Sequence, residues 1–196
     1  MARRIESRSA LLLITSSLLI GCASIDDRVK ASEAAPGEIN WPAEYHPESA
    51  TFFVHHRIDI AAPPEVVWSV LIEAETWPDW YEGASNVAVE GSSDVLHQNG
   101  AFTWNTMGLN LTSRIAEFEP PNRLSWESNH RFIDGYHAWL ILPNETGSIL
   151  VTDESMGGFL AHMQRIFQPN RLNRWHEEWL RQIKSRSELR SSAASR

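Results

Sequence analysis

Hydrophobic positions between Phe52 and Ser155 recur mostly with a period near two, the pattern of strands that bury one face. The period changes once: after Pro63-Pro64-Glu65, the run from Val66 to Leu71 follows helical spacing, and a second short turn begins at Trp77. Gly, Asn and Pro residues separate the remaining segments. We expect strands at 52–60, 86–90, 101–107, 109–118, 123–129, 133–142 and 148–155.

The C-terminal part of the chain is helical in pattern. Helix-spaced residues follow Gly157-Gly158 until Pro169, and a longer helix runs from Asn170 to about Leu189. Its apolar stripe consists of Leu172, Trp175, Trp179, Leu180 and Ile183. This stripe needs a partner surface, and a curved antiparallel sheet is the only large one expected. We therefore predict an α+β domain in which a sheet grips the last helix and leaves a space between them.

The N-terminus has the pattern of an export signal. Three arginines precede an apolar run from Ala10 to Ile20, which is short for a permanent membrane span. Leu19-Ile20-Gly21-Cys22 resembles the lipobox of bacterial lipoproteins, which implies cleavage after residue 21 and lipidation of Cys22. An ordinary secretory signal with an unmodified thiol is the alternative. Ala23 and Ser24 favour the periplasmic face of the outer membrane in a Gram-negative cell.

The sequence predicts one folded domain with extensions at both ends. Residues 22–51 are rich in Ala, Ser, Glu and Pro and are expected to form a flexible tether, although Trp41 and Tyr45 can fold back onto the domain. The domain is expected at 52–190, and residues 191–196 as a disordered tail.

Charge is distributed unevenly along the chain. The formal net charge is −8, which argues against a general nucleic-acid binder, and loss of the first 21 residues would make it −10. From Arg165 onward there are eight basic residues against three Glu, whereas residues 22–164 hold six basic against twenty-one acidic ones. The basic helix either pairs with acidic strand rims or forms a patch for lipid headgroups.

Several short sequence segments resemble those of the SRPBCC, or START-like, superfamily of the polyketide cyclase/dehydrase and lipid transport type. They occur in family order at residues 58–68, 77–80, 100–104, 117–126, 135–139 and 152–155. The resemblance covers roughly Phe52 to Leu189. It implies a helix-grip fold: seven antiparallel strands around the last helix, two small helices at one end, and an apolar cavity. It does not imply one function, because a fold hosts many.

Two ionisable residues are candidates for chemistry in the cavity. His137 lies on a strand between apolar neighbours. It is either a structural histidine satisfied by Glu154, a serine or a backbone carbonyl, or a residue for ligand recognition or proton transfer. Glu154 ends the last strand, and if it faced inward beside His137, the two would form an acid-base pair.

Aromatic residues are the candidates for the cavity lining, with ordinary core packing as the alternative. Phe159 and Leu160 could form a mobile lip at the mouth or simply pack a helix start. The expected ligand-binding set is Trp68, Trp104, Trp126, His137, Trp139, Phe159, Trp175 and Trp179.

The spacing of the remaining candidate residues does not fit other kinds of catalytic or metal-binding site. Residues 176–180 begin like a zinc-protease helix, but Leu180 stands where the second histidine is needed. His55 and His56 are adjacent on a strand and must point to opposite faces. The single cysteine, Cys22, excludes internal disulfides and multi-thiolate metal sites. We expect neither a metal nor a cofactor.

The sequence thus supports three functions. The first is a lipid-anchored envelope protein that binds a hydrophobic small molecule, such as a lipid or polyketide-like compound, without turning it over. The second is a cyclase or dehydratase in which His137 and Glu154 move protons. The third is an interaction module with a filled core that acts through its outer acidic strands.

Overall fold

The computed structural model describes residues 39–195, and the segment with the expected signal and Cys22 lies outside them. Its centre is one antiparallel sheet in the order β1-β7-β6-β5-β4-β3-β2. The strands are β1 (Phe52–Ile60), β2 (Ser85–Val89), β3 (Ala101–Thr106), β4 (Leu109–Glu119), β5 (Arg123–His130), β6 (Ile133–Asn144) and β7 (Gly147–Gly157). The seven expected strands are confirmed, and so is the fold class.

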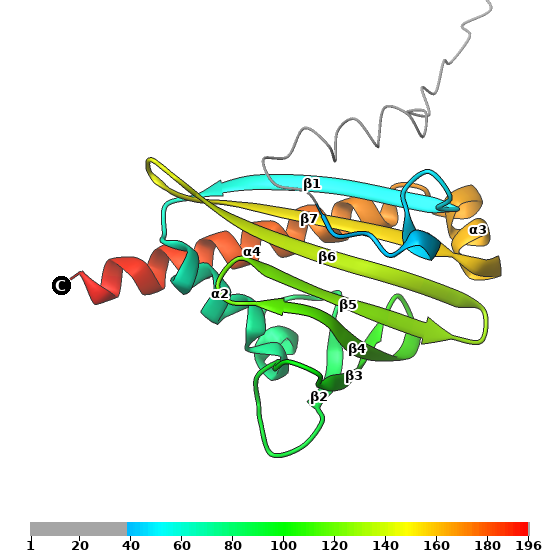
Figure 1. The fold of residues 1–196 in the computed structure, drawn as a ribbon, viewed down its shortest axis with the longest axis horizontal. Helices are drawn as coiled ribbons and strands as arrows, with labels where there is room; N and C mark the ends of the chain where they lie inside the picture. Colours follow the sequence, from blue (N-terminus) through cyan, green and yellow to red (C-terminus); the bar gives the residue numbers. More distant parts are fainter. Residues whose placement is uncertain (1–38, 196) are drawn as a thin grey trace, which may run out of the picture.

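The helices are the short 3-10 helices η1 (Ala43–Tyr45) and η2 (Ala74–Asp79), and the α-helices α2 (Pro64–Ile72), α3 (Gly158–Phe167) and α4 (Arg171–Ala194). All except η1 lie along the concave side of the sheet or at its ends, and η1 lies on the outer face (Figure 1). Helix α4 packs on β1 and α2, as expected for the gripped helix. None of the described helices is long and apolar enough to cross a membrane.

The expectations for the chain ends hold only in part. Helix α4 continues to Ala194, so residues 191–194 are helical rather than disordered. Trp41 and Tyr45 do fold back onto the domain and, with Ile39, cover the outer face of the sheet, so the flexible tether cannot extend to residue 51. There Tyr45 stacks on Tyr136, with ring centroids 5.6 Å apart. We call residues 39–51 the strap.

The strap explains why strand β6 is apolar on both faces. Tyr136, Ala138 and Leu140 point to the outer face and are buried. On the inner face, Trp139 and Ile141 join the main core. Strands covered on both sides lose the apolar-polar alternation.

Tryptophans fill most of the space between the sheet and α4. Trp77, Trp126, Trp139 and Trp179 are at most 1% exposed, and Trp179 lies within 6.2 Å of each of the other three, centroid to centroid. Most of the pairs are edge-to-face or tilted, which aromatic rings favour. The interior is therefore largely solid, and only a small cavity remains beside this cluster.

Candidate functional site

The remaining cavity lies between α4 and the strands β3 to β7. It encloses about 30 Å³, enough for one or two water molecules. Its walls are mostly apolar, with a polar group formed by His137, Glu154 and His176 on one side. The full lining is Tyr81, Trp104, Thr106, Met107, Leu111, Ser128, Ile133, Gly135, His137, Glu154, Met156, Leu172, Trp175, His176 and Trp179.

His137 is buried and contacts side chains on β5, β6 and β7. It is 3% exposed, and its Nε2 is 2.7 Å from the hydroxyl oxygen of Thr152 on β7. The rings of Trp126 and Trp139 lie 4.8 and 4.9 Å from its imidazole. Burial, with a smaller effect from His176, lowers the pKa of His137 well below its ordinary value, so the ring is neutral at physiological pH.

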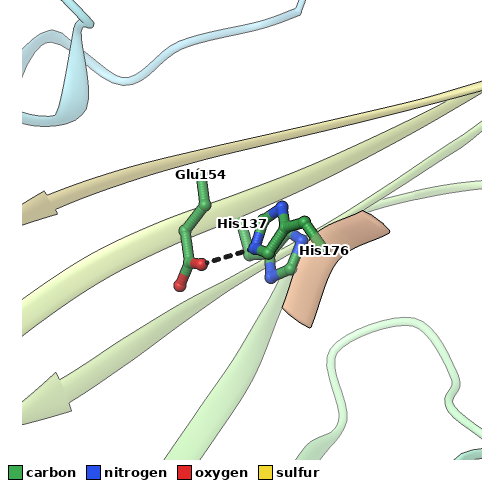
Figure 2. Close-up of side chains that lie close together, drawn as sticks. All are labelled: His137, Glu154 and His176. Atoms are coloured by element: carbon green, nitrogen blue, oxygen red, sulfur yellow. Dashed lines mark hydrogen bonds and ion pairs between the residues drawn. The ribbon is translucent and has the colours of Figure 1, made fainter. Parts of the chain in front are cut away.

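Glu154 faces the same cavity, but its hydrogen-bond partner is not His137. The two residues are opposite each other in the β6-β7 ladder, so both point to the inner face. The carboxylate Oε2 lies 2.9 Å from Nε2 of His176 on α4 (Figure 2). The side chains of His176 and Glu154 are 2% and 16% exposed. A buried imidazole and a carboxylate in direct contact can share or transfer a proton.

The zinc-protease comparison gives His176 no role, and the sequence analysis does not predict it as a site residue. Its position on the last helix nevertheless carries a usable signal. His176 lies four residues after Leu172 and seven before Ile183, so it falls on the apolar stripe of the last helix. A polar side chain on a buried stripe needs a partner from the facing surface.

His137, Glu154 and His176 form a candidate metal-binding group, which the sequence did not predict. Their candidate ligand atoms lie within 4.8 Å of one another, and imidazole nitrogens and a carboxylate oxygen are ligands that Zn²⁺ accepts. The imidazole planes of His137 and His176 are parallel to within 4°, with ring centroids 4.8 Å apart (Figure 2). The direct contact between His176 and Glu154 also suits hydrogen bonding and proton transfer.

The histidine pair on β1 divides between the two faces of the sheet, as expected. His55 points to the outer face, where its Nδ1 lies 2.6 Å from the buried carboxylate of Asp153. His56 points inward, and its ring lies 5.6 Å from that of His176. Burial and the neighbouring histidines lower the pKa of His56 to about 4. The ring of His176 on α4 thus contacts two imidazoles of the inner face of the sheet, those of His56 and His137.

The expected ligand-binding residues separate into two groups. Trp104, His137, Trp175 and Trp179 line the cavity. The others do not: Trp126 and Trp139 pack behind the cavity, Trp68 packs edge-on against Phe118 5.0 Å away, and Phe159 is 63% exposed on α3. The spacing of aromatic residues predicts an aromatic core but does not show which rings border the cavity.

A second, open groove adjoins the cavity. It encloses about 320 Å³ between α3 and the β3-β4 hairpin, and its walls are mainly apolar. Met107 and Ile133 line both the groove and the inner cavity, so these two side chains separate the spaces. Leu160, named with Phe159 as a possible lip, lines the groove.

Comparisons place the chain among known proteins. Residues 51–188 match the family model described as polyketide cyclase/dehydrase and lipid transport. The chain is similar to the Helicobacter pylori hypothetical protein jhp0584, with a TM-score of 0.72, 23% identity, and coverage of 77% of this chain and 96% of that one. It is also similar to the ZhuI aromatase/cyclase of Streptomyces sp. R1128, with a TM-score of 0.59, 15% identity, and coverage of 71% and 94%. No curated protein sequence matches the chain. The structural similarities establish the fold.

Proposed function

Because the chain belongs to the polyketide cyclase/dehydrase and lipid transport family, we propose that it binds a hydrophobic small molecule without turning it over. The ligand class is a lipid or a polyketide-like compound that carries oxygen groups. Its site is the cavity beside α4 together with the groove under α3. The observation that supports this proposal is a buried polar group on the wall of a mostly apolar cavity, which shares Met107 and Ile133 with an open apolar groove.

The polar group offers partners to an oxygenated ligand. The buried Nδ1 of His176 and the indole Nε1 of Trp179 have no hydrogen-bond partner among the described residues, and both residues line the cavity. An unpaired buried polar group costs about 1–3 kcal/mol. A ligand oxygen that accepts from the Trp179 indole N–H recovers part of this cost. Nε2 of His176 faces the Glu154 carboxylate, so in the neutral ring Nδ1 accepts, and both Nδ1 and Glu154 can accept from a ligand hydroxyl.

The inner cavity is narrower than the sequence suggested. Its 30 Å³ is far below the roughly 300–1,000 Å³ of a typical ligand pocket. We therefore assign the ligand body to the 320 Å³ groove and its polar end to the cavity. The Met107 side chain must move to connect the groove with the cavity, and movement of the Met156 side chain can enlarge the cavity further. Unbranched thioether side chains change rotamer at low cost.

The proposal also includes a lipid anchor at Cys22, which holds the domain at the cell envelope. Its support is the lipobox resemblance alone, since residues 1–38 lie outside the described part of the chain. Intact mass of the protein purified from its membrane fraction tests it. A mass that begins at Cys22 with added acyl chains, lost in Cys22→Ser, is expected.

Ligand binding is tested with the full chain by native mass spectrometry and by uptake of fluorescent fatty acids. Wild type is expected to retain or take up an apolar molecule. Met107→Trp, which blocks the passage between groove and cavity, should weaken uptake at least about tenfold, or about 1.4 kcal/mol. Thr146→Trp, in the exposed β6-β7 turn, is the matched control and should bind normally.

An enzyme is the alternative, and the 2.9 Å contact between His176 and Glu154 favours it. In this version the pair moves a proton during cyclisation or dehydration of the bound compound, with His137 supporting the His176 ring. Glu154→Gln should then lower turnover by about 10²–10⁴-fold and change ligand affinity little. Equal loss of binding and turnover would contradict proton transfer.

The solid interior also favours the third candidate, an interaction module. If wild type neither carries nor takes up any apolar compound, the binding proposal fails, and function must lie on the outer surface.

A further inference from the structure

Large exposed hydrophobic side chains gather at one end of the described molecule. They are Phe132 (46% exposed) in the β5-β6 turn and Phe159, Ile166 and Phe167 (63%, 56% and 69%) on α3. The two segments are joined by a 3.0 Å hydrogen bond from the backbone N–H of Leu160 to the carbonyl oxygen of Phe132. We call these four residues the α3 end. Contiguous apolar patches of this kind mark interaction sites.

Helix α3 turns its apolar stripe outward. Phe159, Met163, Ile166 and Phe167 follow one another at positions i, i+4, i+7 and i+8, which places them on one face. The face toward the sheet carries the small, fully buried Ala161 and the half-buried Leu160, which packs against the main core. An amphipathic helix in a folded domain normally buries this stripe. On α3, by contrast, Phe159, Ile166 and Phe167 of the stripe are exposed, and Met163 is half-buried.

Positive charge surrounds the α3 end. Arg131 lies over the ring of Phe132, with its guanidinium carbon 5.1 Å from the ring centroid, and Arg165, Arg171 and Arg174 follow on α3 and the start of α4. No acidic residue occurs between Ser155 and His176. Among residues 39–195, none of these four arginines forms an ion pair with a carboxylate. Pairing with acidic strand rims therefore does not account for these charges.

We propose that the α3 end docks onto the surface of an anionic phospholipid bilayer. Phe159, Ile166 and Phe167 lie below the headgroups, about 5–10 Å deep, and the arginines contact lipid phosphates. A second copy of the chain fits less well, because it would bring four arginines against four others. The docked end also carries the mouth of the groove, which would then face the acyl chains.

The single native cysteine makes a site-specific test possible in the full chain. In a Cys22→Ser background, Phe159→Cys carries an environment-sensitive NBD dye, and Leu189→Cys is the matched control. Leu189 is 67% exposed and lies on the far part of α4. With vesicles of phosphatidylcholine and phosphatidylglycerol, emission at position 159 should rise severalfold and be quenched by spin-labelled lipid. Emission at position 189 should not change.

Charge reversal separates docking of the α3 end from general attachment through the N-terminal segment. Arg165→Glu with Arg171→Glu should abolish the response of the probe at 159, while Arg57→Glu, an exposed change on β1, should leave it intact. Pure phosphatidylcholine vesicles should give a weak response. Equal responses at 159 and 189, or a response that survives the reversal, would overturn the proposal. So would a rise without vesicles that grows with protein concentration, because that would indicate a dimer.

Discussion

Buried imidazoles dominate the electrostatics of the interior. His137 and His56 are kept neutral because burial removes the water that would solvate their charged forms. His176 lies between their rings and bonds to Glu154. Any ligand or proton that reaches the cavity therefore meets the neutral ring of His137 and one imidazole-carboxylate pair, with His56 packed behind His176.

This neutrality predicts loss of stability in acid. The folded-state pKa of both histidines lies below the ordinary value of 6.5, so below pH 6.5 the unfolded chain takes up protons that the folded chain does not. The free energy of unfolding should be level above pH 6.5 and should fall toward pH 4, by up to about 1.4 kcal/mol per pH unit for each histidine. Urea denaturation at pH 7, 6 and 5 measures it.

His56→Gln should make this decline shallower, because one of the two groups no longer titrates in the unfolded chain. His46→Gln, on the exposed part of the strap, should not change it. An unchanged slope in His56→Gln would show that His56 is not the neutral group inferred here.

Among the elements, α3 depends on a tight junction with the β5-β6 turn. Gly158, its first residue, has φ +89°, and a Cβ there would lie 2.7 Å from the carbonyl oxygen of Phe132. Only glycine fits this contact without movement of the backbone. The junction fixes where the apolar stripe of α3 points, and so where the groove opens.

Gly158→Ala should therefore destabilise the protein more than the backbone angle alone explains. Gly91 provides the control, since it has φ +96° and an added Cβ there meets nothing within 4 Å. We expect Gly91→Ala to cost about 1 kcal/mol and Gly158→Ala about 2 kcal/mol more, measured by urea denaturation. If the two variants lose the same free energy of unfolding, α3 can shift to accommodate the added Cβ. The junction would then not fix the direction of the α3 stripe.

The whole molecule is a three-layer arrangement of strap, sheet and α4. The outer layer matters because Tyr136, Ala138 and Phe53 would otherwise present an apolar patch on the convex side. Trp41 covers this patch with its ring 5.9 Å from that of Phe53 and 5.6 Å from that of Tyr136. The strap is thus a structural part of the domain.

Removing a strap contact should weaken the entire fold. Tyr45→Ala deletes a ring that is 7% exposed, and the expected cost is about 2 kcal/mol, or roughly 5 °C in the melting temperature. Phe167→Ala, which removes a ring 69% exposed, should change stability by less than about 0.5 kcal/mol. If calorimetry shows no difference between the two variants, the strap contributes little.

The sequence alone determined the seven strands, the two short elements after β1 and the gripped helix. These follow from local periodicity, because strands and helices place neighbouring residues on faces with fixed periods. The alternation of side chains along a strand also placed His55 and His56 on opposite faces of the sheet. The signal and the lipid anchor remain predictions.

Only the tertiary structure decided the features on which function depends. Three of these features depend on contacts between segments that are distant in sequence. They are the pairing of Glu154 with His176, the strap on the outer face and the outward orientation of the α3 stripe. The cavity volume is the difference between the space enclosed and the side chains that fill it, and a small change in either decides whether a ligand fits. The spacing of hydrophobic residues along the sequence carries no information about that difference in volume.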